Sequence, residues 1–74
     1  MIIHPANCYK NDIVYFNSFD ITNKGTLIEV GTKAKFINWI HDNDKNQDFG
    51  FAGIELENGE ICCTSSDVLE ILEQ

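Results

Sequence analysis

The sequence predicts an all-β fold, and three features of its 74 residues lead to that prediction. Short runs rich in β-branched and aromatic residues alternate with clusters of turn residues. The dipeptide Asn58-Gly59 lies between two apolar runs, which is a strong signal for a β-hairpin. The close spacing of the runs is typical of a small barrel or sandwich. A chain of this length forms one domain with a small core, which we place at residues 1–74.

Each element is expected from its own local pattern. Residues 1–10 have no clean period and are predicted to be an N-terminal arm. Residues 18–25 are predicted to be a loop that ends in the turn residues Asn23-Lys24-Gly25. The polar run HDNDKNQDFG, at 41–50, is predicted to contain a second loop. The expected strands before the last turn are 11–17, 26–30, 33–41, 49–57 and 60–64.

The C-terminal segment allows two interpretations. After a turn at 65–67, VLEIL at 68–72 is predicted to be a short final strand. Asp67 and Glu70 also fit a capping box, so a short 3-10 or α turn is the alternative.

The core is expected from alternation along the strands. In 33–41, alternation places Ala34, Phe36, Asn38 and Ile40 on one face, and it places Ile37 and Trp39 on the opposite one. The expected core is Val14, Phe16, Leu27, Ala34, Phe36, Ala52, Ile54, Leu56, Ile61, Leu69 and Ile71.

The order of these elements resembles that of the SH3-like small β-barrel, the architecture shared by signalling SH3, Tudor and KOW-type domains. NDIVYF resembles its first strand, SFDITNKGTLIEVGT its long first loop and diverging turn, and KAKFINWIH its second strand. FAGIELENGEICCT resembles the central hairpin, and SSDVLEIL the single-turn helix and last strand. The resemblance covers residues 11–72 in layout only, because ALYDY-type, WW-type and basic KOW motifs are absent. It implies a five-stranded SH3-like barrel and no particular function.

Charge excludes several classes of function. The chain has five lysines, no arginine and twelve acids, which give a net charge of −7. Residues 1–41 carry four lysines against three acids, whereas residues 42–74 carry one lysine against nine acids. Nucleic-acid binding draws most of its affinity from Lys and Arg at phosphates, so direct nucleic-acid binding is not expected. Binding to an anionic membrane is not expected for the same reason, and no apolar run is long enough to span one.

The acidic run contains only half of a calcium-binding motif. Counted from Asp42, Asp44 and Asn46 fill positions three and five of an EF-hand loop. Position six is Gln47 instead of glycine, and position twelve is Gly53 instead of glutamate. We therefore interpret the run as a solvated loop and expect no metal there.

The cysteines and histidines form no recognisable catalytic or metal motif. Cys8, Cys62 and Cys63 lack CxxC spacing, although His4 and Cys8 lie four residues apart. Cys62 and Cys63 are instead expected on alternate faces of a strand, with one cysteine buried as a small hydrophobic residue. We therefore expect no cofactor and no enzymatic activity.

The candidate site is an aromatic and acidic surface. Tyr15, Ile37, Trp39 and Phe51 have no obvious place in the predicted core. They either pack at the edge of the core or form an exposed aromatic patch, and aromatics beside carboxylates suit the Lys and Arg side chains of a partner. The candidate binding residues are Tyr15, Trp39, Asp42, Asp44, Asp48, Phe51 and Glu55.

These observations favour a non-catalytic protein-binding module whose partner has a basic surface. Small acidic cytoplasmic proteins of this kind are common among phage and mobile-element inhibitors of host proteins, some of which imitate nucleic acid. The start MIIHPANCYKND is not that of a signal peptide, so a soluble, cytoplasmic protein is expected. The alternative is a structural or assembly protein that self-associates, for example as a homodimer, through a sheet edge and an apolar face.

Overall fold

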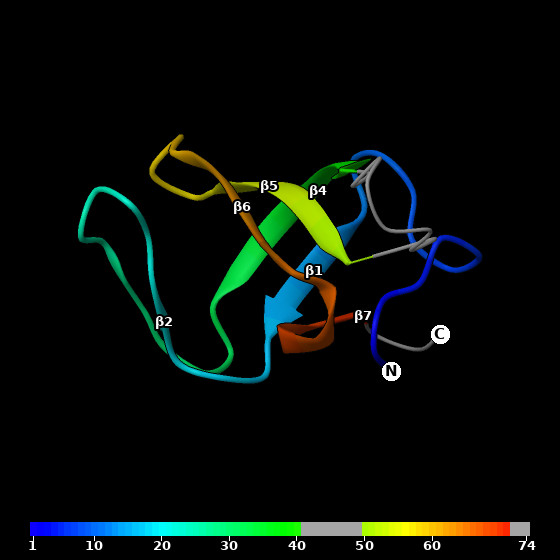
Figure 1. Cartoon of the computed structure of the whole chain (residues 1–74), viewed down its shortest axis with the longest axis horizontal. Helices are drawn as coiled ribbons and strands as arrows, with labels where there is room; N and C mark the ends of the chain where they lie inside the picture. Colours follow the sequence, from blue (N-terminus) through cyan, green and yellow to red (C-terminus); the bar gives the residue numbers. More distant parts are fainter. Residues whose placement is uncertain (41–49, 72–74) are drawn as a thin grey trace.

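The computed structural model describes residues 1–40 and 50–71 and shows a mostly β protein with two sheets. Five strands form an antiparallel sheet in the order β6-β5-β4-β1-β7, and β2 and β3 form a separate hairpin (Figure 1). The strands are β1 Ile13–Phe16, β2 Asp20–Ile21, β3 Leu27–Ile28, β4 Lys33–Ile40, β5 Phe51–Leu56, β6 Ile61–Ser65 and β7 Leu69–Ile71. No helix in the described ranges is long and apolar enough to cross a membrane.

The predicted hairpin at Asn58-Gly59 is confirmed. It joins β5 to β6, which pair from Glu55 opposite Ile61 to Phe51 opposite Ser65. Gly59 has a φ of +88°, a conformation that glycine adopts without steric cost. Its N–H donates to the Leu56 carbonyl at 2.9 Å, which closes the turn.

The C-terminal segment combines the two predicted alternatives. Ser66–Val68 form a single 3-10 turn, η1, and Leu69–Ile71 then pair with β1 as β7. The turn connects β6, at one edge of the sheet, to β7, at the other.

Most of the predicted core is confirmed, and the two errors have one cause. Leu27 is 55% exposed and Ile61 is 67% exposed, whereas their neighbours Ile28 and Cys62 face the core. In a strand, an error of one residue moves every side chain to the other face. The eight confirmed core residues are Val14, Phe16, Ala34, Phe36, Ala52, Ile54, Leu56 and Leu69. Ile71 is half-buried and packs against them.

The prediction for the faces of β4 is wrong in its second half. The pairing of β4 with β5 shifts register between Phe36 and Asn38, so Ile37 is an extra, bulged residue. After the bulge, Trp39 returns to the core side, and its ring lies 5.2 Å from that of Phe36. Asn38 and Ile40 are exposed on the opposite side.

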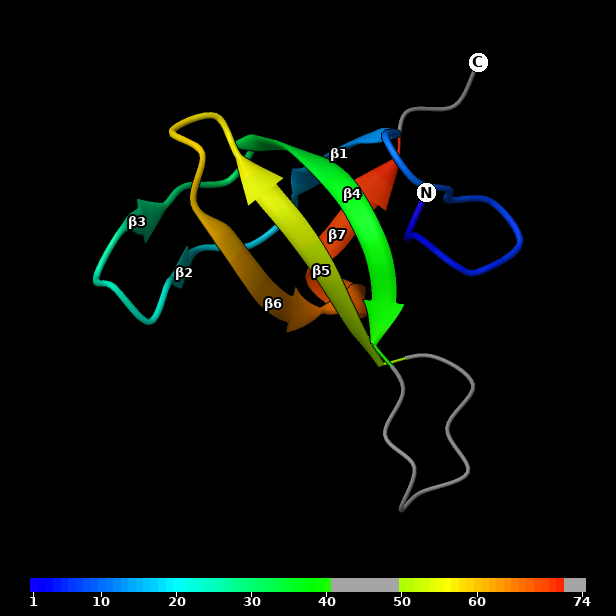
Figure 2. The ribbon, with the colours of Figure 1, turned by 90° about the horizontal axis from the view of Figure 1, so that it is seen from above.

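The N-terminal arm is part of the fold. The Ile3 N–H donates to the Leu69 carbonyl at 3.1 Å, and the Ile71 N–H donates to the Met1 carbonyl at 2.8 Å. Ile3 and Cys8 are both buried in the core. The arm therefore covers the outer edge of β7, close to the N-terminus (Figure 2).

Candidate binding surface

Three of the predicted site residues lie outside the described residues. These are Asp42, Asp44 and Asp48. The other four lie on β1, β4 and β5, and the structure places each of them.

Phe51 and Glu55 occupy the outer face of β5, the face directed away from the core. Phe51 is 46% exposed and pairs with Ile40, which is 39% exposed. Glu55 is half-buried between Lys35 on β4 and Ile61 on β6. These two predicted residues therefore share one strand face.

Tyr15 and Trp39 lie elsewhere. Tyr15 is half-buried on β1, paired with Lys33 on one side and Glu70 on the other. Asn17, the N-terminal amine and Tyr15 hydrogen bond to Glu70 and hold the pKa of its carboxyl below the usual range. The indole Nε1 of Trp39 donates to the Cys8 carbonyl at 3.4 Å, which fastens the N-terminal segment to β4.

A different exposed apolar surface lies on the β2–β3 hairpin. Ile21 and Leu27 are directly opposite each other and are 56% and 55% exposed. Alternation adds Phe19 on the same side, which is 60% exposed, and the exposed carboxylate of Glu29. We call Phe19, Ile21, Leu27 and Glu29 the hairpin face.

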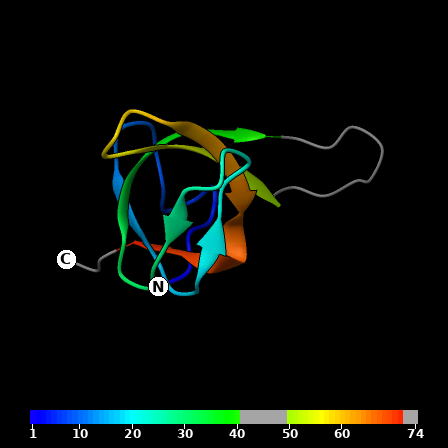
Figure 3. The same ribbon diagram turned by 90° about the vertical axis from the view of Figure 1, so that its left-hand side faces the viewer.

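The hairpin extends from the main sheet beside β6 (Figures 2 and 3). Its inner side is anchored by the side chain of Ile28, which is buried in the core. The Thr64 hydroxyl on β6 donates to Asp20 Oδ2 at 3.2 Å, which joins β6 to β2. No backbone hydrogen bond joins β6 to β2 within the described residues.

Glu60 makes the second link between the hairpin and the sheet. The Thr26 hydroxyl donates to Glu60 Oε1 at 2.7 Å, and the Thr26 N–H donates to the Thr22 hydroxyl at 3.1 Å. Hydrogen bonds from Thr22 and Thr26 lower the pKa of the Glu60 carboxyl. The hairpin face is therefore held in one orientation before any partner arrives, which reduces the entropy cost of binding.

The thiols lack the electrostatic surroundings of a nucleophile. Burial, aided by Asp12, raises the pKa of Cys8 to about 11. Burial also raises the pKa of Cys62 and of Cys63. A reactive cysteine needs the opposite shift, toward the thiolate. Among the described residues, no three His, Cys, Asp or Glu side chains are grouped to hold a metal ion.

The hairpin face left a weak signal in the sequence. Phe19 and Ile21 alternate with polar residues before the Asn23-Lys24-Gly25 turn, and Leu27 and Glu29 alternate after it. Each limb forms a strand of only two residues, which is too short to distinguish an inward from an outward register.

The comparisons with known proteins gave no match: no family model, no curated protein and no solved structure is similar to the chain.

Proposed function

We propose that the chain is a small acidic, non-catalytic module that binds a partner protein through the hairpin face. The observation that supports this proposal most directly is the exposed Phe19, Ile21 and Leu27 on a hairpin held by the buried Ile28 side chain and by the hydrogen bond from Thr26 to Glu60. Exposed apolar side chains gathered on a rigid support are typical of interaction sites.

The expected partner has a basic surface. The chain carries a net charge of −7, and the hairpin face includes the exposed carboxylate of Glu29. A charge of this size steers cationic partners toward the protein. The size and acidity fit an inhibitor from a phage or mobile element, and imitation of nucleic acid is one form of that role. Three free thiols fit a reducing compartment such as the cytoplasm.

We also infer that the two sheets are arranged as an SH3-like small barrel. The strand order, the protruding first hairpin and the 3-10 turn before the last strand support this inference. In that arrangement, the hairpin face occupies the long loop between the first strand of the barrel and the next.

A pull-down with matched variants tests the proposed binding. The wild type and Ile21→Ser/Leu27→Ser are tagged and incubated with lysate at low and at physiological salt, and bound proteins are identified by mass spectrometry. We expect the wild type to retain a basic protein whose affinity, measured afterwards by calorimetry, falls at least about tenfold in the variant. Added salt is also expected to weaken the complex.

The control is Ile13→Ser/Ile61→Ser, which removes two isoleucines of the main sheet that are also more than half exposed. It is expected to retain the partner. Equal binding by the wild type and the hairpin-face variant, or capture of no protein other than the chain itself, contradicts the proposal.

A further inference from the structure

The outer face of the main sheet carries a row of four residues that the proposed function does not use. Ile13, Lys35, Glu55 and Ile61 are paired in register across β1, β4, β5 and β6. Ile13 is 51% exposed and Ile61 is 67% exposed, although both flank charged residues. We call these four residues the outer row.

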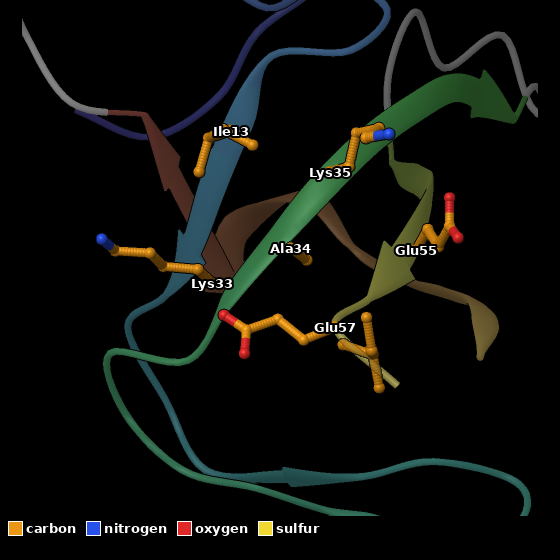
Figure 4. A pocket seen from close by; sticks show the side chains of 7 residues that line it. Ile13, Lys33, Ala34, Lys35, Glu55 and Glu57 are labelled. Atoms are coloured by element: carbon orange, nitrogen blue, oxygen red, sulfur yellow. The ribbon is translucent and has the colours of Figure 1, made fainter. Parts of the chain in front are cut away.

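A second pair of charges extends this arrangement along the strands. Ala34 on β4 is paired with Leu56 on β5. Lys33 is the residue before Ala34, and Glu57 is the residue after Leu56, so both charges flank this pair. Figure 4 shows Lys33 and Lys35 on β4 and Glu55 and Glu57 on or just after β5, around a shallow groove. The face therefore carries a stripe of positive charge beside a stripe of negative charge.

No ion pair joins the two stripes among the described residues. In residues 1–40 and 50–71, the one ion pair joins the N-terminal amine to Glu70, so neither lysine is bridged to either glutamate. Lysine and glutamate opposite each other in a sheet normally have the reach to pair. These four charges therefore remain available to a second molecule.

We propose that a second copy of this chain binds the outer face about a two-fold axis that runs parallel to β4 and β5 and between them. Such a rotation reverses the outer row. The order Ile, Lys, Glu, Ile of one copy then meets Ile, Glu, Lys, Ile of the other. Each lysine faces a glutamate, and Ile13 of each copy faces Ile61 of the other.

The charge pattern favours a second copy of the chain as the partner and an axis parallel to the strands. A uniformly basic partner would repel the lysine stripe, and a uniformly acidic one would repel the glutamate stripe. An axis perpendicular to the strands would place β4 over itself, with lysine against lysine. A two-fold interface requires a self-complementary surface, and the outer row has that property.

The expected dimer is weak because two copies of net charge −7 repel each other. Physiological salt screens that repulsion over about 8 Å but affects charges in direct contact less. The twist of the sheet also limits the contact to the outer row and the two charges beside it.

Charge reversal tests the proposal. Sedimentation equilibrium is measured in physiological salt, where we expect the wild type to dimerise with a Kd below about 1 mM. Lys33→Glu/Lys35→Glu and Glu55→Lys/Glu57→Lys should each self-associate at least about tenfold more weakly, because like charges then face each other. An equimolar mixture of the two variants should form a heterodimer.

Lys10→Glu/Lys24→Glu is the control for net charge, because it has the same overall charge as Lys33→Glu/Lys35→Glu with the substitutions elsewhere. It should dimerise more strongly than that variant. The mutated positions on β4 are exposed, so each variant is expected to fold, and amide NMR spectra check this. Ile13→Ser/Ile61→Ser, which changes no charge, should also weaken the dimer.

A wild type that is monomeric at about 1 mM overturns the proposal. The proposal is also overturned if Lys33→Glu/Lys35→Glu and Glu55→Lys/Glu57→Lys dimerise as strongly as the wild type. It is overturned as well if the equimolar mixture of these two variants stays monomeric.

Discussion

Glu60 shows how one carboxylate connects two parts of the chain that lie far apart in sequence. It accepts hydrogen bonds from Thr22 and Thr26 and so holds the β2–β3 hairpin against the β5–β6 turn. Hydrogen bonds to the ionised form lower a carboxyl pKa. The stability that this contact contributes is therefore present above the unfolded-state pKa, and it is lost as the pH falls through the lower folded-state pKa.

Thr26→Val is expected to raise the pKa of Glu60 toward its ordinary value of 4.5, because it removes one of the hydrogen bonds that lower this pKa and leaves those from Thr22 and Asn58. An NMR titration of the glutamate side-chain carbonyls measures this directly. Thr32→Val is the control, because the Thr32 hydroxyl accepts from the Glu29 N–H and makes no contact with Glu60. An unchanged Glu60 pKa in Thr26→Val would show that the hairpin is not held through this carboxylate.

At the scale of the element, two adjacent apolar residues of the β2–β3 hairpin have different roles. Ile28 is 2% exposed and anchors the hairpin in the core, whereas Leu27 is 55% exposed on the hairpin face. We expect Ile28→Ala to lower the free energy of unfolding by about 2–4 kcal/mol, since it leaves a cavity in the core. Leu27→Ala should change it by less than about 0.5 kcal/mol.

Urea denaturation followed by tryptophan fluorescence measures both values, because Trp39 packs against the core. Similar losses for the two variants would contradict the register described for β3. Ile21→Ala, at the paired position of β2, should behave like Leu27→Ala.

Long elements were predictable from the sequence, and short ones were not. The eight residues of β4 and the six of β5 alternate clearly enough to identify their strands and most of their core residues. The two-residue strands β2 and β3 gave too little pattern to fix a register, so Leu27 was wrongly predicted in place of Ile28. The bulge at Ile37 is a tertiary feature that no periodicity reveals, and it returned Trp39 to the core side.

The candidate surfaces were less predictable than the strands, for a related reason. The hairpin face depends on which side of the β2–β3 hairpin meets β6, and side-chain links such as Thr64 to Asp20 determine that side. The outer row joins residues from four strands that are up to 48 positions apart, from Ile13 to Ile61. Its self-complementary pattern becomes visible only when the strands are aligned in register.

At the scale of the whole molecule, unbalanced charge opposes folding. The net charge is −7, and one ion pair is formed among the described residues. Repulsion among the protein's own like charges destabilises the compact folded state, and salt screens that repulsion. The Debye length falls from about 30 Å at 0.01 M to about 8 Å at physiological ionic strength. The distances between charges on a domain of this size fall within this range of Debye lengths.

We therefore expect the Tm to rise by a few degrees when NaCl is increased across that range. Calorimetry on dilute protein checks this, since dilution keeps the chain monomeric and removes any contribution from self-association. Glu29→Lys reduces the net negative charge at an exposed position and should show a smaller salt response. A Tm that falls with salt would mean that attractive pairs outweigh repulsion. The acidity would then act mainly within the fold, and the net charge would no longer favour a basic partner.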